Sequence, residues 1–261
     1  MNTINDALAG YLWPFVRVSS MLMVMVIFGA ATTPARIRLL VGVAITLAIA
    51  PVLPPMPGIE LFSLPAVFVI AQQILIGTAM GLVTILLVQT FVLTGQIIGM
   101  QTSLGFSSMV DPSSGQQVPA VGNLFLLLTT MIFLAVDGHL LLIRMMVASF
   151  DTLPVSMSGI SVENYRSLAL WGSTMFASAL TMAMSSIVAL LMINLSFGVM
   201  TRAAPQLNIF SIGFPVTMIS GLVILWLTLS PVMAHFEQIW DSAQALLCDL
   251  VNLQCKVDGG P

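Results

Sequence analysis

Six long apolar runs, separated by short polar segments, take up most of the chain. They cover about residues 11–30, 39–53, 65–100, 120–150, 167–201 and 212–240. A membrane-spanning helix needs about 20 mostly apolar residues, and few segments alternate between apolar and polar residues as membrane strands do. The pattern therefore predicts an all-α, polytopic membrane protein with about six long, kinked helices. We expect Pro231 to kink or end the last of them.

The third run, from about 65 to 100, is longer than a bilayer requires. As a helix it would extend about 54 Å, against a hydrocarbon core of about 30 Å. It carries two glycine pairs, Gly77 with Gly81 and Gly95 with Gly99, which lie about five turns apart and would share one stripe of a straight helix. Small residues let another helix approach closely, although glycine is also common in membrane helices generally. We expect a helix-packing seam that assembly with neighbouring subunits requires.

Several polar side chains interrupt the apolar runs. Arg17 lies in the first run, where it either extends toward the membrane interface or pairs with a neighbouring subunit. Five amides in the third run need hydrogen-bond partners, so much of this helix should face protein or water. They are Gln72, Gln73, Gln89, Gln96 and Gln101.

Asp137 and His139 lie within the fourth run, and ionisable residues inside a membrane are candidates for function. Side chains two positions apart do not face each other on a helix. Arg144, two turns beyond Asp137, lies on a similar face. A structural role in helix contact or capping is therefore favoured over a proton relay.

Between the third and fourth runs the chain becomes small and polar but carries one charge, Asp111. Irregular backbone among membrane helices is tolerated only where protein or a water-filled cavity surrounds it, so we expect residues 101–118 to fold back into the protein. The bulky apolar groups there could act as a stopper on a mobile stem, and an ordinary connector is the alternative. The segment in question is Gly105, Phe106, Ser107, Ser108, Met109, Val110, Asp111 and Pro112.

Composition agrees with a membrane location. Of 261 residues, 58% are hydrophobic and 7% are charged, against about 25% charged in a typical soluble domain. The net charge is −3 and the seven Lys and Arg residues are scattered, which does not indicate nucleic-acid binding. No HExxH, GxSxG or Walker signature indicates an enzyme, and we expect neither cofactor nor metal. A small-solute secondary transporter remains an alternative class.

Charges and cysteines make predictions about the ends of the chain. Arg36, Arg38 and Arg202 fall in loops that six crossings place on one side, which should be cytoplasmic, with both termini outside. The tail 241–261 contains Cys248 and Cys255. If the tail is helical, these cysteines are about 10 Å apart along the axis, which is too far for a disulfide.

Three segments together resemble one known family. They are GQIIGMQTSLGFSSMVDP (95–112), GHLLLIRMMVASFDTLP (138–154) and NLSFGVMTRAAPQLNIFSIGFP (194–215). In order and spacing they resemble the FliR family, whose members are membrane subunits of the type III protein-export gate, with an injectisome counterpart of the same fold as an alternative. The chain departs from the family pattern at Ser103, where Gly is common, at Ser185, where Pro is common, and at Asp137, where Asn is frequent.

The resemblance implies a single membrane domain over 1–261. It would consist of a FliP-like part (about 1–164), a FliQ-like helical hairpin (about 165–240) and the tail. It implies assembly with FliP-like and FliQ-like subunits, contacts with FlhB and FlhA, and location in the bacterial inner membrane at the flagellar basal body. By the same resemblance, residues 105–112 form a plug in a channel for unfolded flagellar proteins. Arg202, Pro205 and Gln206 form a cytoplasmic turn that contacts the next export component.

Overall fold

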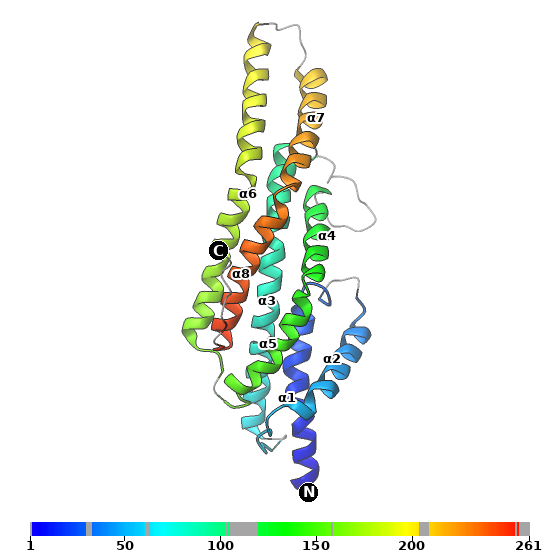
Figure 1. Cartoon of the computed structure of the whole chain (residues 1–261), viewed down its shortest axis with the longest axis vertical. Helices are drawn as coiled ribbons and strands as arrows, with labels where there is room; N and C mark the ends of the chain where they lie inside the picture. Colours follow the sequence, from blue (N-terminus) through cyan, green and yellow to red (C-terminus); the bar gives the residue numbers. More distant parts are fainter. Residues whose placement is uncertain are drawn as a thin grey trace. The chain divides into compact units, whose positions relative to one another are not determined.

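The computed structural model describes residues 2–29, 33–60, 63–102, 104, 120–157, 159–203, 209–253 and 255. Regular structure in these residues is helical throughout (Figure 1), which confirms the all-α prediction. Contacts between Cα atoms divide the chain into two compact units, and four of the described helices contribute residues to both.

The first unit consists of residues 1–87, 133–172 and 240–261. Its helices are α1 (Asn2–Val24), α2 (Ala35–Ile49), the short 3-10 helix η1 (Ala50–Val52), the start of α3 (Leu64–Gln101), the last residues of α4 (Ala120–Ala135), α5 (Gly138–Thr152), the start of α6 (Val162–Ala203) and the end of α8 (Val232–Leu250). Trp13, Leu22 and Leu247 are fully buried in its core. The chain is irregular after Val52, where further prolines follow, as their restriction of the backbone predicts.

The second unit consists of residues 88–132 and 173–239. It contains the end of α3, most of α4 (Ala120–Ala135), the greater part of α6, α7 (Ile209–Leu229) and the start of α8. The rings of Phe91 on α3 and Phe236 on α8 lie 6.0 Å apart between centroids. Thr94 on α3 donates a hydrogen bond to the Ala179 carbonyl of α6 at 3.4 Å.

Two of the predicted apolar runs are interrupted. The sixth run breaks before Pro231, as expected, because proline cannot donate the backbone hydrogen bond that would continue α7 into α8. The fourth run also breaks, which the apolar pattern did not predict, and Asp137 at the break has a left-handed backbone with φ of 55°. The buried Gly138 follows, and a side chain there would collide with the Phe133 ring.

Three described helices are long and apolar enough to cross a membrane, namely the segments Ala35–Val52, Leu64–Gln101 and Val162–Met200. The interrupted pairs α4 with α5 and α7 with α8 raise the number to five if each pair is one span. The chain is therefore a polytopic helical membrane protein. Helix α1 is not among these candidates and ends at Val24 rather than near residue 30. The expected orientation, with both termini outside, was derived by counting six membrane crossings. It therefore stays a prediction.

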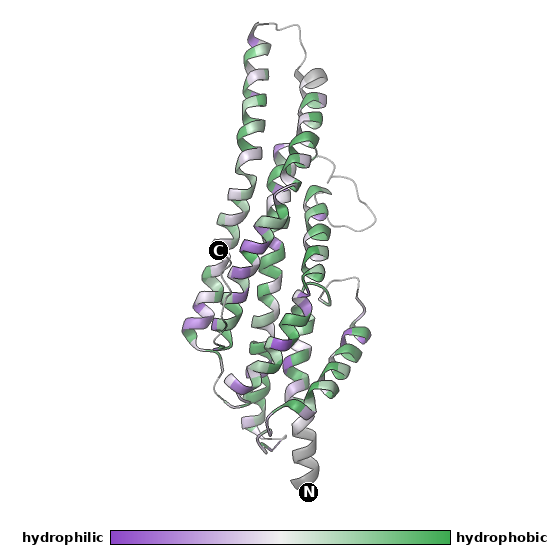
Figure 2. Ribbon diagram, in the orientation of Figure 1, coloured by the Kyte–Doolittle hydropathy of each residue, from purple (hydrophilic) through white to green (hydrophobic). Residues whose placement is uncertain are grey.

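The long helices differ in how much of their surface the chain itself covers. In the most apolar part of α3, 61% of residues are buried, against 22% in the corresponding part of α6. Figure 2 shows apolar residues along much of α6 and along the coloured part of α7. Something other than this chain must therefore cover much of α6.

Candidate functional site

Arg17 of α1 is fully buried in the first unit and bonds to two other helices. Its Nε donates to Gln73 Oε1 of α3 at 2.7 Å. One terminal nitrogen, Nη1, donates to the carbonyl and hydroxyl oxygens of Ser149, at 3.1 and 3.0 Å. The other, Nη2, donates to the Leu153 carbonyl at 2.9 Å. The guanidinium carbon also lies 4.1 Å from the centroid of the Phe150 ring.

This arrangement explains how a charged side chain is accommodated in a buried position. The carbonyls of Ser149 and Leu153 belong to the C-terminal end of α5, where the last carbonyls of a helix lack intrahelical donors and carry partial negative charge. The face of an aromatic ring also attracts a cation. Arg17 therefore caps α5 and ties it to α1 and α3.

Both sequence-based alternatives for Arg17 were wrong. Its side chain is fully buried and bonds to α3 and α5 of the same chain, so it neither extends out to the surface nor is left to pair with a neighbouring subunit. Its partners on α5 lie more than 130 residues away in sequence. The signal that could have identified the cluster is Gln73, one of the five amides for which the sequence required a partner. Its oxygen accepts from Arg17, while its Nε2 is buried without a partner.

The first glycine pair on α3 holds α1 at close range. A Cβ atom at Gly77 would collide with the Arg17 carbonyl oxygen and the Ser20 hydroxyl. A Cβ at Gly81 would lie 2.8 Å from the Met21 carbonyl oxygen. These obstacles include backbone atoms, which cannot rotate away as a side chain can.

The second glycine pair lies in the second unit and faces α4. A Cβ at Gly95 would lie 2.7 Å from Phe125 Cδ2 and 2.8 Å from the Val121 carbonyl oxygen. At Gly99 the nearest atom is Val121 Cβ at 3.4 Å, which is close to ordinary contact. Helices of this chain thus pack against both glycine pairs. That assembly with other subunits also requires these glycines stays a prediction.

The expected plug, residues 105–112, lies outside the described residues, as do Pro205 and Gln206 of the expected partner turn. Arg202 lies in the last turn of α6 and is exposed. Thr102, just before the plug segment, is 2% exposed and bonds to the Gly99 carbonyl at 3.0 Å. Its Cβ would lie 2.8 Å from a Cβ atom at Gly221 of α7, so Thr102 itself is tightly packed against α7.

Asp137 and His139 are not brought together as a catalytic pair. Asp137 is exposed and precedes the first residue of α5, where its side chain forms no capping hydrogen bond. His139 is partly buried, and its Nδ1 has no partner. Arg144 is exposed. Asp tolerates the left-handed conformation better than most residues, which suggests that backbone geometry is what position 137 requires.

A pocket of about 380 Å³ opens in the second unit beside the break at Pro231. Hydroxyl side chains of α3, α6 and α7 line it together with His235 of α8. The Ser186 hydroxyl in its wall is buried without a hydrogen-bond partner. The rest of the lining is mostly apolar. Secondary transporters hold their substrates beside interrupted helices, so this pocket is the feature of the described residues that comes nearest to that alternative. No group of three or more His, Cys, Asp or Glu among the described residues could hold a metal ion.

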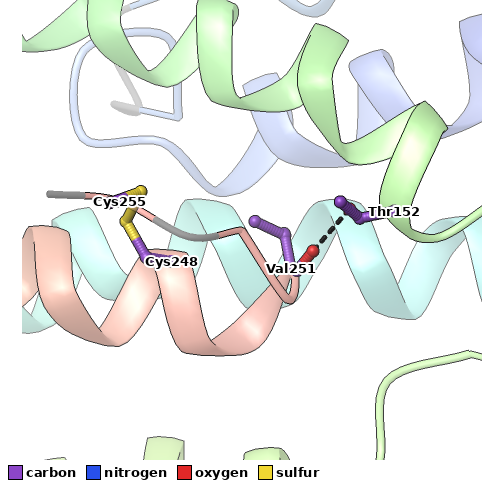
Figure 3. The surroundings of a disulfide bond; sticks show 4 residues. All are labelled: Thr152, Cys248, Val251 and Cys255. Atoms are coloured by element: carbon purple, nitrogen blue, oxygen red, sulfur yellow. Dashed lines mark hydrogen bonds between the residues drawn. A yellow bond between two sulfur atoms is a disulfide. The ribbon is translucent and has the colours of Figure 1, made fainter.

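The C-terminal end of α8 corrects the prediction about the cysteines. The helix stops at Leu250, and Asn252 adopts a left-handed conformation with φ of 53°. The Leu253 N–H donates to the Cys248 carbonyl at 2.8 Å and the Asn252 N–H donates to the Asp249 carbonyl at 3.2 Å, which together form a Schellman motif. The chain therefore reverses, and Cys255 forms a disulfide with Cys248 at a Cα–Cα distance of 5.9 Å (Figure 3).

Comparison with known proteins gives consistent matches over nearly the whole chain. The family model described as "Bacterial export proteins, family 1" matches residues 8–243. The flagellar biosynthetic protein FliR of Escherichia coli K12 is 35% identical over 243 residues, which are 93% of this chain and 92% of the relative. FliR of Pectobacterium carotovorum is 35% identical over 242 residues, with the same shares. FliR of Bacillus subtilis 168 is 25% identical over 258 residues, 97% of this chain and 98% of the relative.

Proposed function

The chain belongs to the FliR family of bacterial export proteins, and on this basis we propose that it is a subunit of the flagellar type III protein-export gate. In this role it helps to form and plug a channel through which unfolded flagellar proteins leave the cell. Its partners are FliP-like and FliQ-like subunits, with FlhB and FlhA associated, in the bacterial inner membrane at the flagellar basal body. The observation that carries the proposal is the match to flagellar relatives over more than nine-tenths of both chains.

The exposed surface of α6 supports a multi-subunit assembly. Large apolar side chains recur every three or four residues along one stripe of the helix and are all more than 45% exposed. They are Phe176, Leu180, Met184, Val188, Leu191, Leu195 and Val199. Asn194, next to this stripe, is also exposed. An amide facing hydrocarbon would lack a partner, so we assign this part of α6 to contact with another subunit.

Purification from its own cells in mild detergent tests the proposal. We expect two smaller membrane proteins, FliP-like and FliQ-like, to copurify in fixed proportion with the chain. Asn194→Leu should reduce their recovery. Ser196→Ala is the matched control. The Ser196 hydroxyl already donates to the Met192 carbonyl of its own helix, so it does not need a hydrogen-bond partner on another subunit. Recovery of the chain as a lone homodimer that binds a small solute would instead support the transporter alternative.

Residues 105–112 are proposed as the plug that keeps the idle channel closed to ions. Apolar constrictions can close a pore by dewetting, and the anchored Thr102 gives the segment a fixed starting point. Deleting 106–110 should leave assembly largely intact but make the membrane leak small ions. Replacing Phe106, Met109 and Val110 by serine tests the same idea at constant length. An assembled deletion complex whose conductance equals that of the parent would show that these residues are not the seal.

The turn with Arg202, Pro205 and Gln206 is proposed to contact the next export component, FlhB or FlhA. Arg202→Glu should weaken that contact and reduce export while the membrane helices still assemble. Arg36→Glu is a control for the charge change, since the same argument from positive residues assigns Arg36 to the same side of the membrane. Equal effects of the two substitutions would point to altered membrane insertion rather than a lost contact.

The flagellar role is preferred over the injectisome counterpart because the relatives named above are flagellar proteins. A deletion strain distinguishes the two. We expect loss of flagellar filaments and motility, with any injectisome secretion unchanged. The division into a FliP-like part (about 1–164) and a FliQ-like hairpin (about 165–240) is part of the same proposal, and the succession of α6 and α7 supports it.

A further inference from the structure

The end of α8 is held in place by two other segments of the first unit as well as by its own turn. The Thr152 hydroxyl donates to the Val251 carbonyl, joining the end of α5 to the end of α8 (Figure 3). Asn164 Nδ2 at the start of α6 donates to the Asp249 carbonyl at 2.7 Å. Hydrogen bonds therefore satisfy the carbonyls of Cys248, Asp249 and Val251 at this end of the helix. The reversal that brings Cys255 back to Cys248 is part of the fold.

The two cysteines differ in their access to solvent. Cys248 lies on α8 and is 5% exposed, whereas Cys255 lies beyond the turn and is exposed. They are the only two cysteines in the sequence, so no other pairing within the chain competes with this one. The fold thus presents one accessible thiol beside one sheltered thiol.

Disulfides form and persist in oxidising compartments such as the bacterial periplasm, and they are rare in the cytosol, where thiols are kept reduced. We propose that the C-terminal end of the chain lies on the oxidising, outer side of the membrane, where the Cys248–Cys255 disulfide fastens the turn after α8. The inference rests on the disulfide and the turn around it, and it is independent of the export function.

The bond forms by exchange with a dithiol oxidase in its disulfide form. The exposed Cys255 thiolate attacks one sulfur of the oxidase disulfide, giving a mixed disulfide and releasing the other oxidase sulfur as a thiolate. The Cys248 thiolate then attacks Cys255 Sγ, which closes the Cys248–Cys255 bond and releases the oxidase as a dithiol. Two electrons and two protons pass from the two cysteines to the oxidase.

Placing the C-terminal end outside gives an orientation of the chain in the membrane that does not depend on counting arginines. If α7 and α8 together cross the membrane once, the end of α6 lies on the opposite, cytoplasmic side. That is the side to which the positive-inside rule assigns Arg202. Two independent lines of reasoning then give the same orientation.

Thiol labelling of the full chain in its own cells tests the proposal. Cells are quenched in acid and treated with a polyethylene-glycol maleimide that shifts the protein on a gel. We expect no adduct before reduction and two adducts per chain after it. In cells that lack the periplasmic dithiol oxidase, two adducts should appear without reduction. Two adducts without reduction in the parental cells would overturn the proposal.

Single variants report the side of the membrane whether or not the disulfide forms. In Cys248→Ser, a membrane-impermeant maleimide added to spheroplasts should label Cys255. The matched control is Arg202→Cys in a background with both native cysteines changed to serine. Its thiol should be labelled only after the membrane is permeabilised. The opposite labelling pattern would place the C-terminal end in the cytoplasm and refute the inference.

Discussion

Replacing Gly95 by alanine should destabilise the packing of α3 on α4, whereas the same change at Gly99 should not. The added Cβ at Gly95 would lie 2.7 Å from the Phe125 ring and 2.8 Å from the Val121 carbonyl oxygen. The ring can shift toward the pocket that it lines, but the carbonyl is part of the α4 backbone. The two helices must therefore move apart.

Both alanine variants gain helix propensity, but they differ in how much the added Cβ overpacks the contact with α4. Alanine favours a helix over glycine by up to about 1 kcal/mol at either position. Overpacking at Gly95 should cost about 1–3 kcal/mol, while the contact of 3.4 Å at Gly99 adds little cost. Since helix propensity cancels in the comparison, Gly95→Ala should be about 1–3 kcal/mol less stable than Gly99→Ala.

Thermal unfolding of each variant in mild detergent, followed by fluorescence-detected gel filtration, measures this difference. We expect a lower melting temperature for Gly95→Ala and an unchanged or higher one for Gly99→Ala. A double change to leucine at both positions should go further and reduce the yield of the assembled complex. If the two alanine variants melt at the same temperature, α3 and α4 are not held at the separation that the structure shows, and the reasoning fails.

Further predictions concern Arg17 and Asp137. Arg17→Gln should reduce the yield of folded chain, because each buried acceptor left unpaired on α3 and α5 costs about 1–3 kcal/mol. Arg17→Lys should also fail to give the normal yield, since one ammonium nitrogen replaces the three donor nitrogens of the guanidinium. Wild-type melting behaviour in Arg17→Lys would contradict the capping role. Asp137→Asn should leave stability and export unchanged because Asn also accepts the left-handed backbone, whereas Asp137→Val should cost about 1–2 kcal/mol in the same melting assay. Loss of motility in an Asp137→Asn variant that still assembles would favour the proton-relay hypothesis.

The long helices could be predicted because their signal is local. The run expected at 65–100 forms α3 at Leu64–Gln101, and the break at Pro231 follows from proline's missing N–H. The break at Asp137 was harder to predict, because the contacts that surround it reach a distant part of the chain. Gly138 packs against the Phe133 ring, which itself packs against Trp240 at 5.4 Å between ring centroids.

The sequence by itself determined the helical membrane architecture, the close-packing glycines and the family, because apolar runs, small residues and motif spacing are properties of consecutive residues. Only the tertiary structure decided which groups the polar residues and the cysteines contact. Arg17 finds its acceptors on α5, more than 130 residues away, and their positions depend on how three helices pack. The Cys248–Cys255 bond likewise depends on one left-handed residue, Asn252, which reverses the chain where a continuing helix would have separated the sulfur atoms.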